Sequence, residues 1–257
     1  MGTMHDLLYL SESKMQALVP QLPGQLKRRL GIEAGVSVWF ASLRATLPGG
    51  VQQPPLAVLD EVVRMIERDR VVRQRIESGV TIGDWIRFEE DFRYADASPE
   101  LWQGDDAAVS RLVYFVATTL PQFVLCGSAV HVLDRRQSAM PSSGPAVGVF
   151  YVDAVRAYGR KVSELADEGA ISDPLPAPDI EPGRGLRIGL QALHNEAEHH
   201  PGWSSAVRLA GHARVLATDD STGQGSAILA TPLYIEYSSS IRPGHGRVGN
   251  LLRRRHP

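Results

Sequence analysis

Hydrophobic positions follow two different spacings along the chain, and the shorter spacing predicts strands. Alternating or continuous apolar runs bounded by glycine, proline or serine are typical of strands. The clearest alternation is at 81–96, where Ile86, Phe88, Glu90, Phe92 and Tyr94 share one side and charged residues take most of the other. In all, the pattern predicts seven strands, at 6–11, 32–46, 81–96, 111–119, 123–134, 206–218 and 226–239.

Apolar residues three or four apart predict the helices. A serine cap at Ser11 or Ser13 precedes Met15, Leu18 and Val19, and a second helical turn follows at 25–30. Pro54-Pro55 starts an amphipathic helix over 56–66. Further helices are expected at 150–169 and around 186–199.

The resulting order is β-α-β-α-β-β-β-α-α-β-β, which predicts the α+β class. Neighbouring late strands are joined by short turns, so we expect a largely antiparallel sheet of about seven strands with helices packed on one face. Residues 5–240 are expected to form one domain. Residues 241–257 carry five arginines and no acid, and are expected to be an Arg-rich flexible tail.

Composition and charge narrow the function classes. The net charge is −2, which does not favour a nucleic-acid or membrane surface, and no stretch is apolar enough to span a membrane. The N-terminus lacks the pattern of a signal peptide, so we expect a cytoplasmic protein. The chain has one cysteine, Cys126, which excludes an intramolecular disulfide. No cofactor motif is present, and we expect neither a cofactor nor a metal.

Glu90 is the most unusual single position. Strict alternation places it between Phe88 and Phe92 on the apolar side of its strand, where a carboxylate has a raised pKa and can act as an acid, a base or a cation partner. The alternative is a β-bulge at Glu89-Glu90 that turns the side chain into solvent. The bulge is the favoured interpretation, because three acids occur in a row.

Two other clusters suggest chemistry but have simpler explanations. Cys126, Ser128, His131 and Asp134 lie within nine residues, yet a regular strand places Cys126 and His131 on opposite faces, and Cys126 is expected to be a core residue. His131 can still face a pocket from a neighbouring strand. His194 and Glu198 share one helical face, but they do not form a zinc-binding motif and are expected in solvent.

Three segments resemble a group of uncharacterised proteins from GC-rich bacteria. They are the strand and Ser-x-x-Lys helix start at 6–31, the strand at 84–94, and the strand at 123–136 with its Gly-Ser-Ala-x-His-Val-Leu sequence. The likeness covers roughly residues 5–135 and the last two strands. No activity is known to carry over from that family. The resemblance draws attention to Ser11, Lys14, Glu90, Ser128 and His131 as a possible shared pocket.

Two functions from different classes remain open. The first is a binding or regulatory module that holds a small molecule or a protein partner, with Ser11, Lys14 and Ser128 as candidate binding residues. The second is a cofactor-independent enzyme in which Glu90 and His131 form an acid/base pair on adjacent strands. The first is favoured because no catalytic constellation is recognisable. The feature that separates them is whether Glu90 and His131 point into one cavity.

Overall fold

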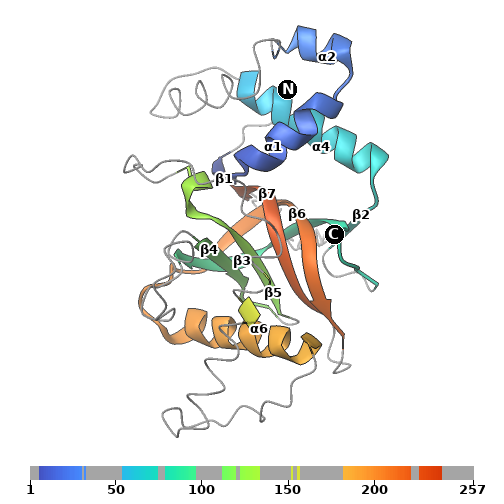
Figure 1. Ribbon diagram of the computed structural model, residues 1–257. Coiled ribbons are helices and arrows are strands. Elements are labelled where there is room, and N and C mark those ends of the chain that lie inside the picture. Colours follow the sequence, from blue (N-terminus) through green and yellow to red (C-terminus); the bar gives the residue numbers. More distant parts are fainter. Residues whose placement is uncertain are drawn as a thin grey trace, which may run out of the picture.

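The computed structural model describes residues 6–30, 32, 54–74, 79–96, 112–119, 122–133, 152, 155–156, 182–220 and 226–238 (Figure 1). Its elements follow the predicted order closely, with one additional short strand. They are β1 (Leu7–Leu10), α1 (Glu12–Leu18), η1 (Val19–Gln21), α2 (Gly24–Arg29), α4 (Pro54–Asp69), β2 (Val72–Gln74), β3 (Trp85–Asp96), β4 (Leu112–Ala117), β5 (Phe123–Ser128), η4 (Ala129–His131), α6 (Pro182–His199), β6 (Val207–Asp219) and β7 (Ala227–Tyr237).

Five of the strands close into a barrel. β3, β4 and β5 form an antiparallel meander, β6 and β7 form an antiparallel hairpin, and β6 returns to pair antiparallel with β3. A parallel pair between β5 and β7 completes the circle, with Phe123 opposite Ile228 and Leu125 opposite Ala230. Closure leaves no free edge among these five strands, which removes the usual site of uncontrolled strand pairing.

Two further strands extend the sheet. β1 pairs antiparallel with the end of β7, where Leu10 lies opposite Tyr234. β5 pairs with the first half of β7, so β1 continues the line of β5 along the same strand. The short strand β2 pairs in parallel with the start of β3.

Side chains from alternate positions fill the barrel interior. Phe88 and Phe92 of β3 meet Phe123 of β5 edge to face, with ring centroids 5.5–5.8 Å apart. Tyr9 enters the same interior from β1 and crosses Gly127 so closely that a Cβ added there would lie 2.5 Å from the tyrosine hydroxyl. A larger residue at this position of β5 would therefore have to displace the buried Tyr9 ring.

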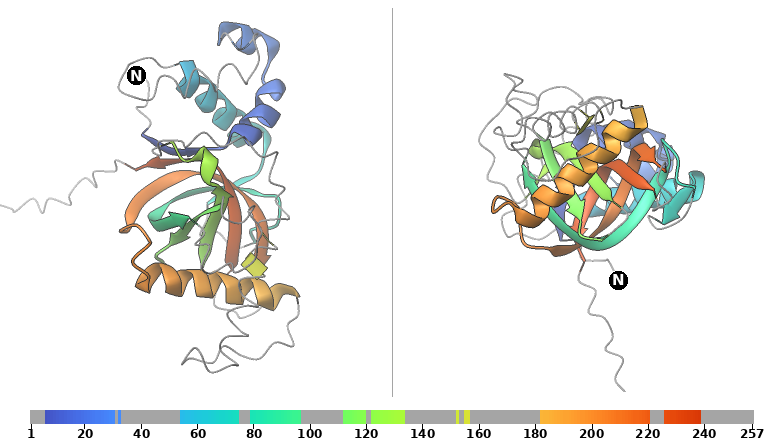
Figure 2. Two further views of the ribbon diagram at one scale, coloured as in Figure 1. Left: turned by 60° about the vertical axis from the view of Figure 1, so that its left-hand side comes forward. Right: turned by 90° about the horizontal axis from the view of Figure 1, so that it is seen from below.

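Helices cover the barrel at two opposite ends (Figures 1 and 2). α6 buries Leu186, Leu190 and Leu193 against the outward-facing side chains of β4, β5 and β7. At the other end, α1 and α4 share a second apolar cluster with the ends of β1 and β7 and with Trp85. Each fully buried aliphatic side chain contributes roughly 1.5–3 kcal/mol, so both helical layers are firmly attached.

The α+β class is confirmed, but the predicted sheet arrangement is wrong in two respects. Five of the seven described strand pairs are antiparallel, but β2–β3 and β5–β7 are parallel, and the pairs β3–β6 and β5–β7 close the sheet into a barrel. The helices also pack on two sides of it and not on one face. Strand β2 was not predicted. The expected strand at 32–46, most of the expected helix at 150–169, and the Arg-rich segment 241–257 lie outside the described residues.

The connectivity of the barrel is that of the OB-fold, a five-stranded Greek-key barrel. The circle runs β3-β4-β5-β7-β6, its one parallel pair joins the third and fifth barrel strands, and α6 lies between the third and fourth. β1, α1, α2, α4 and β2 precede this barrel in the chain. Among the helices of the described segments, none is long and apolar enough to cross a membrane.

Candidate functional site

Ser11 and Lys14, two of the predicted binding residues, meet where β1 leads into α1. Ser11 is the N-cap of α1, but its hydroxyl does not cap the helix. Lys14 lies one turn further on, and its Nζ is 3.3 Å from Ser11 Oγ. The Ser11 backbone N–H donates to the carbonyl of Leu233, 2.8 Å away, so β1 and β7 fix the position of the serine. The Ser-x-x-Lys spacing thus produces a real side-chain contact.

The other partners of Lys14 come from β7, more than two hundred residues along the chain. Lys14 Nζ donates to Thr231 Oγ1 and to the carbonyl of Pro232, each at 2.9 Å. The pairing of β6 with β7 shifts register next to Pro232. A bulge of this kind takes a residue out of the ladder, and proline has no N–H to offer it. The bulge therefore accounts for a strand carbonyl that is available to a side chain.

The environment of Lys14 is electrostatically unusual. Burial lowers the pKa of its ammonium group to about 7, the nearby thiol of Cys126 opposes that fall, and the guanidinium of Arg214 adds to it. Arg214 lies on β6 directly opposite Thr231, so both side chains belong to the same face of the sheet. The three hydrogen-bond partners of Lys14 are neutral oxygens. A half-buried amine without a carboxylate partner among the described residues is the main feature of this site.

Cys126 is a buried core residue, as the sequence predicts. Burial raises the pKa of its thiol, which makes it a poor nucleophile. Ser128 ends β5 and is half-buried, and it is not part of the hydrogen-bonded group around Lys14. His131 was expected to lie on the same strand as Cys126, but β5 ends at Ser128 and His131 closes the 3-10 turn η4. Its ring packs edge-on against Tyr9, with centroids 5.8 Å apart.

Glu90 keeps the regular alternation of β3. Pairing of β3 with β6 runs without a shift from Trp85 to Phe92, so the favoured bulge at Glu89-Glu90 does not occur. The side chain is half-buried, and its Oε2 accepts a hydrogen bond of 2.8 Å from Thr119, just beyond β4. His131 follows Ser128, which pairs with Leu112 at the start of β4. The two residues therefore lie near opposite ends of β4, and the described structure does not bring them together.

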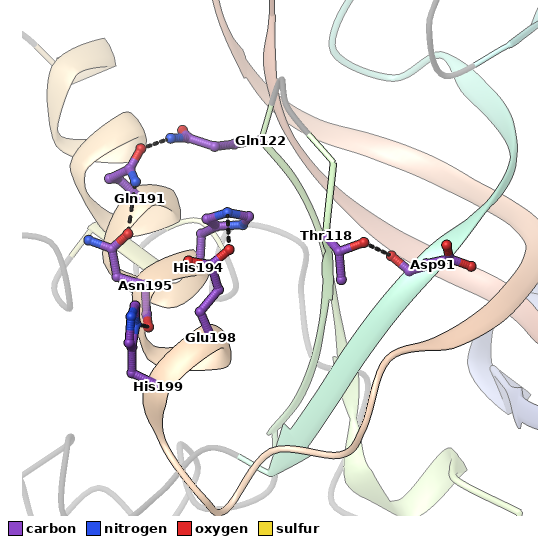
Figure 3. A network of polar contacts seen from close by, with 8 residues as sticks. All are labelled: Asp91, Thr118, Gln122, Gln191, His194, Asn195, Glu198 and His199. Carbon is purple, nitrogen blue, oxygen red and sulfur yellow. Dashed lines mark hydrogen bonds and ion pairs between the residues drawn. The ribbon is translucent and has the colours of Figure 1, made fainter.

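The α6 cluster that was expected in solvent is a row of polar contacts (Figure 3). The expectation is wrong for His194, which is buried because it lies on the same side of the helix as Leu190 and Ala197, whereas Glu198 is exposed. His194 Nε2 lies 3.4 Å from Glu198 Oε1, and His199 Nδ1 lies 2.8 Å from the carbonyl of Asn195. Gln191 links this row to Gln122 before β5. Within the segments that the structure describes, no group of three potential metal ligands is found.

A second polar group was missed by sequence reasoning. His212 of β6 is buried, with Nδ1 3.1 Å from the hydroxyl of Tyr234 on β7 and Nε2 3.2 Å from Oε1 of Glu67 on α4. Burial lowers the pKa of His212 and raises the pKa of Tyr234, so a neutral imidazole accepts from the phenol at Nδ1. Nε2 lies beside the Glu67 carboxylate but forms no aligned hydrogen bond within the described residues. A histidine within an apolar strand was the available signal, at Gly211-His212-Ala213.

The face on which OB-folds take oligonucleotides is covered by the chain itself. That face is centred on the second and third barrel strands. Here these strands are β4 and β5, whose outward side chains are buried by α6 together with Val152 and Val155. They are Leu112, Tyr114, Val116, Val124 and Cys126.

Comparison with known proteins finds one relationship. Neither the curated proteins nor the solved structures give a match to the chain. A family described as a family of unknown function (DUF7019) matches residues 7–239. The resemblance to an uncharacterised family that the sequence indicated is thereby confirmed. Because the match spans most of the sequence, the chain belongs to the DUF7019 family.

Proposed function

We propose that this protein is a small-molecule-binding module whose ligand presents an anionic group to Lys14. The observation that carries the proposal is the amine of Lys14, which is half-buried among Ser11 Oγ, Thr231 Oγ1 and the Pro232 carbonyl. A buried cation without a counter-charge is costly, and an anion that enters the site removes that cost. Arg214, on the same face, adds a second positive charge.

The alternatives have less support. The outward face of β4 and β5 is buried, so we expect no nucleic acid there. A protein partner would contact the surface without needing the charge of Lys14. A cytoplasmic location is part of the proposal, since a single buried thiol suits a reducing compartment.

The test is a thermal-shift and calorimetry screen of the full chain against phosphate, acetate and pyruvate. Lys14→Met removes the charge and keeps most of the side-chain volume. Lys27→Met is the matched control, because the hydrogen bond that Lys27 makes within the described residues is to the carbonyl of Pro20 on the N-terminal helices. A charge-assisted hydrogen bond contributes about 1.5–3 kcal/mol, so Lys14→Met should weaken anion binding by roughly ten- to a hundredfold.

The control separates a specific site from general charge effects. Lys27→Met should bind the same anions as the unmodified protein. Equal loss in both variants, or no response of the unmodified protein to any anion, would refute an anion site at Lys14. In the second case a protein partner becomes the better hypothesis.

A further inference from the structure

The groups around the amine of Lys14 suit a neutral, nucleophilic amine as well as a charged ammonium. Two hydroxyls and a carbonyl surround Nζ at 2.9–3.3 Å. Two of these groups, Ser11 Oγ and Thr231 Oγ1, can either accept a hydrogen from an ammonium or donate one to a free amine. The site can therefore hold Lys14 in both protonation states without leaving a polar atom unpaired.

Burial and the Arg214 cation favour the neutral amine of Lys14, and the thiol of Cys126 opposes them. Cys126 on β5 is a buried thiol, and Arg214 on β6 is a cation, while no carboxylate bonds to Nζ in the described part of the chain. Burial and a neighbouring positive charge are the two devices that activate lysines towards carbonyl compounds. A lysine in such a place acts as a base or forms Schiff bases.

We propose that Lys14 forms a Schiff base with the carbonyl group of a small oxo acid. The inference rests on the proposed function, because Arg214, opposite Thr231 on the same face, supplies the charge that holds the ligand carboxylate. When the ligand carboxylate binds Arg214, the amine of Lys14 is available to react with the carbonyl carbon of the same ligand. An oxo acid is thus the class of ligand that uses both groups.

The chemical step needs no oxidant or reductant. The free amine of Lys14 attacks the carbonyl carbon, and the carbonyl oxygen takes up a proton to give a carbinolamine. The hydroxyl leaves as water with one proton from a neighbouring hydroxyl such as Ser11, and the nitrogen returns its proton to that hydroxyl as the C=N bond forms. One carbonyl compound and one amine give one imine and one water, and hydrolysis reverses the step.

The experiment is reductive trapping of the full chain with pyruvate and cyanoborohydride, followed by intact mass and peptide mapping. The chain is well suited to it, because Lys14, Lys27 and Lys161 are its only lysines. An amine with a pKa near 7 is about half unprotonated at neutral pH, whereas an ordinary lysine is almost fully charged. Lys14 should therefore be labelled at least about tenfold faster than Lys27.

Three comparisons decide the outcome. Lys14→Arg should lose the adduct while Lys27→Arg keeps it, and acetone, which has no carboxylate, should label Lys14 far more slowly than pyruvate. Equal labelling of Lys14 and Lys27 would overturn the Schiff base, and equal labelling by acetone would overturn the oxo-acid class. If pyruvate and acetate both stabilise the protein through Lys14 but no adduct forms, the proposed function stands and this inference fails. If pyruvate and acetate do not bind and pyruvate does not label Lys14, both the proposed function and the Schiff base are refuted.

Discussion

Lys14 makes the stability of the protein depend on pH in the direction opposite to that of a lysine paired with a carboxylate. Its pKa is about 7 in the folded chain and near 10.5 when unfolded. Below pH 7 both states carry the proton, so Lys14 adds no slope. Between these values only the unfolded chain binds the proton, and stability therefore rises with pH, by at most about 1.4 kcal/mol per pH unit.

We expect the free energy of unfolding to rise with pH in proteins that keep Lys14, and this contribution to be absent in Lys14→Met. Urea unfolding from about pH 7 to about pH 9 should show the unmodified protein and Lys27→Met gaining stability relative to Lys14→Met. Parallel profiles for all three proteins would mean that Lys14 is solvated and has an ordinary pKa.

Individual residues of the site were only partly predictable. The resemblance to an uncharacterised family drew attention to Ser11 and Lys14, and the structure shows that one helical turn brings their side chains together. Thr231 and Pro232 gave no comparable signal, since their role arises from a bulge in a strand far along the chain. Glu90 was unusual in sequence, but its polar contact with Thr119 depends on where β4 ends.

At the scale of elements, the contact between α4 and the barrel depends on a polar group as well as on apolar packing. Glu67 reaches from the last turns of α4 to Nε2 of His212, which is buried on β6. Glu67→Ala removes the carboxylate beside this buried nitrogen and should lower the free energy of unfolding by about 1 kcal/mol. Glu67→Gln keeps an oxygen in place, and because His212 is neutral it should cost much less.

Urea unfolding near neutral pH measures this difference. A similar loss of unfolding free energy in Glu67→Ala and Glu67→Gln would indicate that His212 requires the negative charge of Glu67 and not merely an oxygen at that place. No loss in either would mean that the apolar cluster of Val58, Leu59 and Val62 holds α4 alone.

Elements were predicted well where their signal is local. The alternation in β3 and the apolar periodicity of α4 each identified the element and its buried side. β2 was missed because three residues are too few to show a period. The parallel pair β5–β7 was missed for another reason, since it joins strands that are separated by α6 and β6 and no turn sequence records it.

At the scale of the molecule, closure of the barrel explains why the site can exist. Strands β5, β6 and β7 bring Cys126, Arg214 and Thr231 to neighbouring positions on its outer face. α1 adds Lys14 from a segment that precedes the barrel in the chain. The pairing of β1 with β7 then places this N-terminal lysine over the last hairpin.

The same architecture sets the expected boundary of the folded unit. The last described contacts of the chain are the pairing of Tyr237 with Leu209 and the bond from Ser238 N to the Arg208 carbonyl, and the family match ends at residue 239. Removal of residues 241–257 deletes five arginines and none of these contacts, so the melting temperature should not change. A chain that ends at Ile235 is the control, because it loses Glu236 and Tyr237, which pair with β1 and β6, and should melt at a lower temperature. A fall in melting temperature on removal of 241–257 alone would contradict the boundary and assign the arginine-rich segment a part in the folded structure.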